Sequence, residues 1–345
     1  MFPLTERNYQ GTVRAHSSTM ESWFGSGSPN VTMKATIPVN HFLKSFEHIP
    51  DVITRCRVQY GRRTKGHSLW MWCAAGLLFV LAGCSSLSLY RYADWIILWQ
   101  ADHYLDLTSD QRHDLSERLT SLLARHRREA IPQYEDFLVQ IQQRFERGLT
   151  SQDIGWVFTN YDRLRNDLVN LVIADSGIVL ASVNSSQVHT LEVAFQKDTI
   201  KATKLVHAPM PERLKKRADD TIDWIEDWLG SLSQAQETQI RELNLTFPDT
   251  QPSWATYRQQ QQLALLALLR QPHTSESLAH DLRALLAFYP DPTAPHAYQK
   301  VTRQMRDVVT PMVLAVDQQI TPRQRRHAVA KLQQLIDQLH DLQTD

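Results

Sequence analysis

Cysteine is scarce in this sequence, and none occurs beyond Cys84. The rest of the chain therefore holds neither a disulfide framework nor a thiolate metal site. Glycine is scarce in the same stretch, which contains only four of the eleven glycines, and no glycine-rich loop that could cradle a phosphate is present. A chain that is poor in glycine and rich in leucine, glutamine, arginine and alanine favours helices.

An excess of charge of one sign is also missing, because 37 Lys and Arg residues balance 37 Asp and Glu residues. The balance hides a split: residues 1–83 carry 9 basic and 4 acidic side chains, whereas residues 84–345 carry 28 and 33. Non-specific binding of nucleic acid needs clustered positive charge. We therefore expect no nucleic-acid partner for the mildly acidic main body.

The stretch GRRTKGHSLWMWCAAGLLFVLAGC, residues 61–84, predicts a bacterial export signal. A basic start precedes an apolar run over 69–81, which is shorter than the roughly 20 residues of a permanent transmembrane helix. Small residues before Cys84 favour cleavage between Gly83 and Cys84. Cys84 would then carry diacylglycerol on its sulfur and palmitate on its amine, and several acyl chains together give stable anchoring to a membrane. The alternative is a buried core helix with a free cysteine.

An export signal of ordinary length would begin near Val58, although 57 residues precede it here. Residues 1–57 have scattered Ser, Thr and Pro and weak periodicity. We expect them to be disordered, or to be an over-extension of a chain whose translation starts near Val58. We assign residues 58–83 to a lipoprotein signal peptide and residues 84–345 to a helical periplasmic domain.

Helical periodicity continues through most of residues 84–345, and prolines separate the periodic segments. This pattern predicts an all-α, elongated multi-helix bundle, with a kink or break at Pro132. The stretch GIVLASV at 177–183 is strand-like, although helix is favoured. The apolar stripes are Leu115, Leu119, Leu122 and Leu123; Tyr134, Phe137, Leu138, Ile141 and Phe145; Val157, Tyr161, Leu164, Leu168 and Leu171; Ile222, Ile225 and Leu229; and Val329, Leu332, Ile336 and Leu339.

Five short motifs predict where helices begin. Each has an apolar residue, then Thr, Ser or Asn, and an acidic or amide side chain three residues further on. In such a capping box each of the two side chains accepts a hydrogen bond from the other residue's backbone N–H. A cap contributes about 0.5–2 kcal/mol. The motifs span 107–111, 149–153, 183–187, 232–236 and 320–324.

The basic run RHRRE at 125–129 is the main candidate for a binding surface. Its arginine guanidinium groups could bind the phosphates of lipopolysaccharide or the acidic groups of glycans. The plainer interpretation is i, i+4 pairing with nearby acids, such as Arg125 with Glu129. No metal is expected, because the HExxH pattern and thiolate ligands are both missing around His126. The candidate binding residues are Tyr104, Arg125, His126, Arg127 and Tyr134.

An aromatic group follows soon after the predicted anchor: Tyr90, Tyr92, Trp95, Trp99 and Tyr104. Aromatic side chains with a polar tip favour membrane interfaces, so this group could rest against lipid. Packing into the bundle is favoured, because Trp95, Leu98 and Trp99 fit one helical face.

No catalytic residue is assigned and no cofactor is expected. The sequence has no GxSxG motif. Its paired acids, such as Glu135 and Asp136, are adjacent and so point in different directions on a helix, where they cannot straddle a substrate. An enzyme is therefore unsupported by any motif.

The chain resembles a family of uncharacterised proteobacterial lipoproteins over roughly residues 77–345. The resemblance rests on the lipobox at 81–84 and on segments such as YRYADWIILWQADHYLDLTSDQ and RHRREAIPQYEDFL. It implies a helical protein anchored by lipid to the outer membrane and facing the periplasm, and it implies no reaction. Arg125 departs from the family, which often has Trp there. The matching positions are Tyr90, Asp94, Tyr104, Leu107, Gln111, His126, Arg127, Pro132 and Tyr134.

The LTxxQ-like boxes also resemble those of the small helical periplasmic chaperones of the Spy/CpxP type. We therefore expect a lipid-anchored cell-envelope protein that acts as a binding or chaperone-like module. Its partners would be the membrane and other envelope proteins or glycans. The alternatives are a hydrolytic enzyme acting on an envelope polymer and a passive structural spacer.

Overall fold

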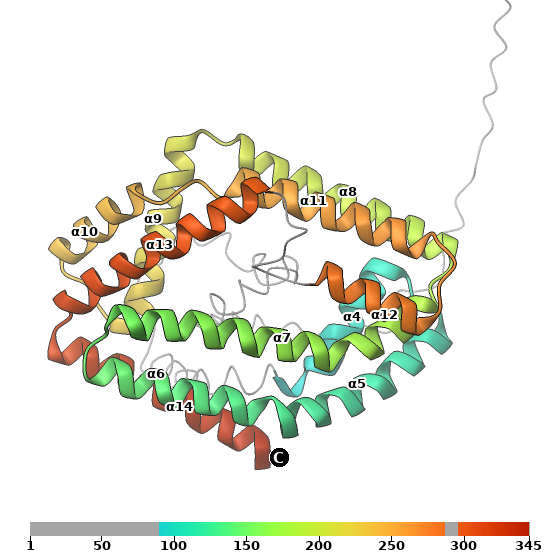
Figure 1. The fold of residues 1–345 in the computed structure, drawn as a ribbon, viewed down its shortest axis with the longest axis horizontal. Helices are drawn as coiled ribbons and strands as arrows, with labels where there is room; N and C mark the ends of the chain where they lie inside the picture. The colour runs from blue at the N-terminus through green and yellow to red at the C-terminus, as the bar shows by residue number, and fades with distance from the viewer. Residues whose placement is uncertain (1–89, 287–295, 345) are drawn as a thin grey trace, which may run out of the picture.

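The described part of the chain is built from helices and the short turns between them (Figure 1). The computed structural model describes residues 90–286 and 296–344, and no strand occurs in these ranges. The predicted all-α multi-helix bundle is thus confirmed, and the strand-like stretch at 177–183 lies at the end of a helix. The helices are α4 (Ala93–Leu105), α5 (Ser109–Glu129), α6 (Ile131–Glu146), α7 (Ser151–Ala181), α8 (Ser185–His207), α9 (Met210–Leu229), α10 (Gln234–Leu245), α11 (Gln251–Leu269), α12 (Ser275–Leu285), α13 (His296–Gln319) and α14 (Pro322–Thr344).

Capping boxes begin these helices where the sequence predicts them. Both bonds of the box are present at the starts of α5, α7 and α10. At α8, Gln187 N donates to Asn184 Oδ1 at 3.1 Å and Asn184 N donates to Gln187 Oε1 at 3.0 Å. At α14, Thr321 and Gln324 form the same pair of bonds. A sixth box, Thr274 with Ser277, begins α12 and was not predicted.

The helix breaks next to Pro132, as predicted. α5 ends at Glu129 and α6 begins at Ile131, so Pro132 lies in the first turn of α6. A missing N–H costs little there, because the first amides of a helix have no partner within it. Pro311, in contrast, lies inside α13, which the sequence did not predict.

The helices of residues 90–286 and 296–344 form two halves that correspond in order and in packing. In the first half α4 packs against α5 and α8, and in the second half α9 packs against α10 and α14. The pair α5–α6 matches α10–α11, and α7 matches α12–α13. Each half also lends its last helix to the other: α8 lies along α11, and α14 lies along α6. These two pairs occupy opposite sides of the oval outline in Figure 1.

In each half, one pair of glutamines joins two capping boxes. Gln111 of α5 and Gln187 of α8 exchange side-chain amide hydrogen bonds of 3.1 and 2.7 Å. Gln236 of α10 and Gln324 of α14 do the same at 3.1 and 3.2 Å. Each amide also donates to a backbone carbonyl of the turn before the partner helix. We call these two contacts the glutamine interlocks.

Apolar side chains fill two separate cores. The larger core joins α4, α5, α7, α8, α11 and α12, and the smaller joins α9, α10 and α14. α7 and α12 lie close together at Gly177, where an added Cβ would lie 2.6 Å from Ser275 O and 2.7 Å from Ala279 Cβ. A larger residue at this crossing would therefore force the two helices to shift, so glycine favours their close contact.

The export signal lies outside the described residues, and so do Gly83, Cys84 and the segment 1–57. Within 90–286 and 296–344, no single helix combines the length and the apolar character that crossing a bilayer requires. α7 and Ser185–Lys204 of α8 satisfy that test only as a pair, and they are bent by 119° at the turn between them.

Candidate functional site

Two of the predicted binding residues, His126 and Tyr134, meet at the break between α5 and α6. The His126 ring stacks on Tyr90 with centroids 5.8 Å apart, and it lies 5.6 Å from the Tyr134 ring. The Tyr90 hydroxyl is 3.0 Å from His126 Nδ1 and 3.4 Å from Leu123 O. Because Tyr90 lies three residues before α4, this aromatic cluster (Tyr90, His126 and Tyr134) fastens the segment that leads into α4 to α5 and α6.

Burial changes the acid–base properties of all three rings in the aromatic cluster. It lowers the pKa of His126 to about 4 and raises the pKa of Tyr134 to about 12. Burial also raises the pKa of Tyr90, against the opposing effect of nearby Arg127. The three side chains are therefore neutral near pH 7. A neutral imidazole with rings on two sides and a hydroxyl on Nδ1 fits a structural contact between helices, and we interpret the cluster so.

Arg125 points to a different neighbour. Its guanidinium bonds the carboxylate of Asp175 on α7, which also lies 3.5 Å from Arg118. The expected pairing of Arg125 with Glu129 is therefore wrong, because Glu129 is bonded by Arg128 at 2.8 Å instead. Arg125 is thus the residue of the basic run that joins α5 to α7. In the two described ranges no group of three or more His, Cys, Asp or Glu side chains is placed to hold a metal.

Tyr104 belongs to a third contact, between α4 and α8. Its hydroxyl donates to Asp198 Oδ2 at 2.7 Å, and its ring lies 6.1 Å from that of Phe195. Lys201 lies 3.8 Å from the other oxygen of Asp198. Four of the five predicted binding residues are thus divided among three helix contacts, and the fifth, Arg127, lies near Tyr90 of the aromatic cluster.

The aromatic side chains of α4 are more exposed than expected. Trp95 is 63% exposed and Trp99 is 40% exposed, although Leu98 between them packs on the larger core. The favoured interpretation that Trp95 and Trp99 pack into the bundle is therefore wrong. Their helix turns Leu98, Ala101 and Tyr104 toward the core and leaves the two indoles on the surface.

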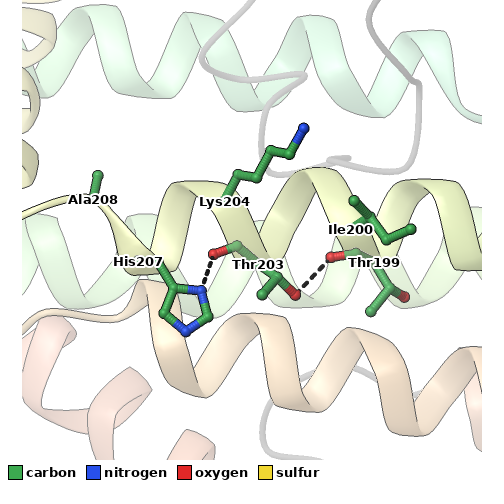
Figure 2. A pocket seen from close by; sticks show the side chains of 6 residues that line it. All are labelled: Thr199, Ile200, Thr203, Lys204, His207 and Ala208. Carbon is green, nitrogen blue, oxygen red and sulfur yellow. Dashed lines mark hydrogen bonds between the residues drawn. The ribbon is translucent and has the colours of Figure 1, made fainter.

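A hollow of about 430 Å³ lies along the second half of α8, and sequence reasoning missed it (Figure 2). It is open to solvent, and its described lining comes from α8 and the residue that follows it. The signal was present in the sequence, since basic residues recur at spacings of four, three and three over 197–207, which places them on one helical face. The α8 hollow is lined by Thr199, Ile200, Thr203, Lys204, His207 and Ala208.

The lining of the α8 hollow combines an apolar side chain with positive charge. Ile200 is 58% exposed, and Lys204 extends away from the helix beside it in Figure 2. Thr203 Oγ1 donates to Thr199 O at 2.8 Å, and His207 Nδ1 donates to Thr203 O at 2.9 Å. These bonds use the Thr203 hydroxyl and Nδ1 of His207 on the helix itself. The lining also presents the Ile200 side chain, threonine methyl groups and the Lys204 ammonium group.

Fold and site together define an all-α protein of two corresponding halves, with an apolar and basic hollow on one exchanged helix. The model of a family of unknown function (DUF6279) matches residues 103–292, more than half of the chain, and the chain belongs to this family. No curated protein and no solved structure matches it. The expected membership in an uncharacterised family is thus confirmed.

Proposed function

We propose that this chain is a lipid-anchored cell-envelope protein whose helical body binds other polypeptides in a chaperone-like manner. Acylated Cys84 would hold it to the outer membrane, with the helices facing the periplasm. The anchor is supported by the lipobox at 81–84, in which a basic flank, a short apolar run and small residues precede the cysteine. Ser85 follows Cys84, which in lipoproteins favours transfer to the outer membrane.

The α8 hollow is the observation that carries the binding role. An exposed isoleucine beside lysines offers apolar contact and positive charge to one ligand. Lys197 and Lys201 continue the basic face along the helix toward α4. Lysine stems add apolar surface of their own while the ammonium groups stay in water. A partly unfolded polypeptide with apolar and acidic side chains matches this surface. The capping boxes, which resemble those of Spy/CpxP-type chaperones, agree with such a role.

The binding role is tested by light scattering from an aggregating acidic client, such as reduced α-lactalbumin, with the full chain held in lipid nanodiscs. We expect the wild-type protein at several-fold excess to reduce scattering. The double variant Ile200→Ser, Lys204→Glu should lose most of this effect, because it removes the apolar contact and reverses the charge.

A matched control is Leu245→Ser with Lys216→Glu, which makes the same changes on the exposed surfaces of α10 and α9. Leu245 is 69% exposed, so its replacement leaves the cores intact. The control should suppress scattering as the wild type does. Unchanged scattering with wild-type protein would contradict the binding role. Equal suppression of scattering by both double variants would show that binding does not depend on the α8 hollow.

The anchor is tested separately by intact mass measurement of the protein extracted from membranes. Cleavage before Cys84 together with acyl chains on that residue is the expected result. A chain that retains residues 58–83 and carries no acyl chain would contradict the anchor.

A further inference from the structure

Exposed apolar side chains gather on one short segment of the described surface. Of the ten large hydrophobic residues that are exposed in the described ranges, four lie between residues 92 and 99, on or just before α4: Tyr92, Trp95, Ile97 and Trp99. Tyr92, Trp95 and Trp99 share one side, and we call these three side chains the α4 face, whereas Ile97, two positions from each indole, lies on another side of the helix. A helix that is apolar on both sides is normally buried on both sides, so this face needs an occupant.

The order of the chain indicates what that occupant is. Tyr90, the first described residue, is six residues after Cys84. Six residues span at most about 20–22 Å even when fully extended. Tyr90, three residues before α4, therefore cannot lie farther than this from a membrane that holds Cys84, and the bilayer is the apolar partner that is always within reach.

The residue types of the α4 face fit the interfacial layer of a bilayer. Trp and Tyr are enriched at the level of the lipid headgroups, where the ring contacts acyl chains and the polar tip stays hydrated. Asp94, the acidic residue of this segment, already accepts a hydrogen bond from Trp95 N at 2.7 Å. On the opposite side, Leu98, Ala101 and Tyr104 hold α4 to the larger core, so the face is rigidly presented.

We propose that the α4 face docks on the surface of the lipid bilayer and fixes the orientation of the helical body on the membrane. This inference rests on the proposed function, because it takes the acylated Cys84 as the tether. Tether and face act together: the acyl chains supply attachment, and the indoles of Trp95 and Trp99 add a second point of contact that restricts rotation.

The test is quenching of tryptophan fluorescence by brominated lipid. The full chain is reconstituted into vesicles of phosphatidylethanolamine and phosphatidylglycerol, with or without bromine on the acyl chains near the headgroup. Six tryptophans lie beyond Cys84, and Trp95 and Trp99 are two of them. If the six emit equally, docking should quench about a third of the emission of the cleaved protein.

The double variant Trp95→Phe, Trp99→Phe keeps aromatic rings on the surface and should lose this quenched share. Trp224→Phe, which removes a partly exposed indole from α9, should leave the quenched intensity unchanged. Equal quenched intensity in the wild type and the double variant would overturn the proposal. This is also the result expected if the α4 face binds a protein partner and does not contact lipid.

The intact mass of the same sample separates this inference from the proposed function. An acylated Cys84 without quenching at Trp95 and Trp99 leaves the anchor standing and refutes the docking. Quenching that disappears in the double variant, in a chain without acyl chains, supports the docking and refutes the lipid anchor.

Discussion

Gly155 and Gly177 lie on the same helix, α7, in opposite environments. A Cβ added at Gly155 meets nothing within 4 Å, whereas at Gly177 it would lie 2.6 Å from Ser275 O and 2.7 Å from Ala279 Cβ. Neither glycine has a positive φ. Alanine at each site therefore makes the same change in helix propensity, and only the packing against α12 differs.

The two alanine variants should change stability in opposite directions. Alanine in place of glycine inside a helix stabilises by about 0.5–1 kcal/mol, so Gly155→Ala should raise the free energy of unfolding by that amount. At Gly177 the same gain is opposed by overpacking, which costs about 1–3 kcal/mol. The obstacle there is backbone, which cannot rotate aside as a side chain could. We expect Gly177→Ala to be destabilised by about 1–2 kcal/mol.

Urea unfolding followed by circular dichroism measures both variants against the wild type. The difference between them cancels the propensity change and isolates the packing cost, expected to be about 1–3 kcal/mol. A Gly177→Ala protein as stable as Gly155→Ala would refute the close approach of α7 and α12. Equal losses at both sites would show instead that α7 is not helical throughout.

Two further variants test the aromatic cluster and the interlocks. The pKa of His126 is lowered to about 4 in the folded state, so between about pH 4 and 6.5 the unfolded chain binds a proton that the folded chain does not. Stability from this group is complete above about pH 6.5 and falls toward pH 4. The advantage of wild type over His126→Phe should shrink by about 2–3 kcal/mol across that range in urea unfolding, and parallel pH profiles would contradict this. Gln236→Glu keeps the acceptor of the capping box but loses the amide donor to Gln324 and to Gln319 O, which should cost about 1–3 kcal/mol. Gln234→Glu, exposed in the first turn of the same helix, should be neutral or slightly stabilising, and equal losses in the two would refute the interlock.

Helix starts were predictable because a capping box joins residues only three apart. The bond between Thr108 and Gln111 depends on local sequence alone, and so does the break at Pro132. The box at Thr274 was missed because its third helical residue is Ser277, whose hydroxyl replaces the usual carboxylate or amide. Local patterns thus located most helix boundaries without any knowledge of the tertiary fold.

The interlocks and the exchange of last helices could not be predicted in this way. Gln111 and Gln187 are 76 residues apart, and Gln236 and Gln324 are 88 apart. A glutamine that caps a helix has the same sequence signature whether or not a second glutamine meets it. The partner of Arg125 was mispredicted for a related reason, since Asp175 is 50 residues away and the local candidate, Glu129, was nearer in sequence.

The candidate surfaces were visible in the sequence only in part. The spacing of residue types showed which side chains share a face of α8 or α4, but not which face the bundle covers. Trp95 and Leu98 both fit an apolar stripe of α4, but the structure leaves Trp95 exposed and partly buries Leu98, because α5 and α8 cover only one side of the helix. Whether an apolar face of a helix is exposed depends on tertiary contacts, which the local sequence does not reveal.

The contact between α4 and α8 relates the two proposed surfaces to each other. Tyr104 donates from α4 to Asp198, which directly precedes Thr199 at the edge of the α8 hollow. Two packed helices have their axes about 8–10 Å apart. If the α4 face rests on the bilayer, this contact holds the α8 hollow near the membrane surface. The exchanged packing of α8 on α11 keeps it from moving independently of the second half. A binding site held there would meet polypeptides at the membrane surface, where the lipid anchor would place the protein.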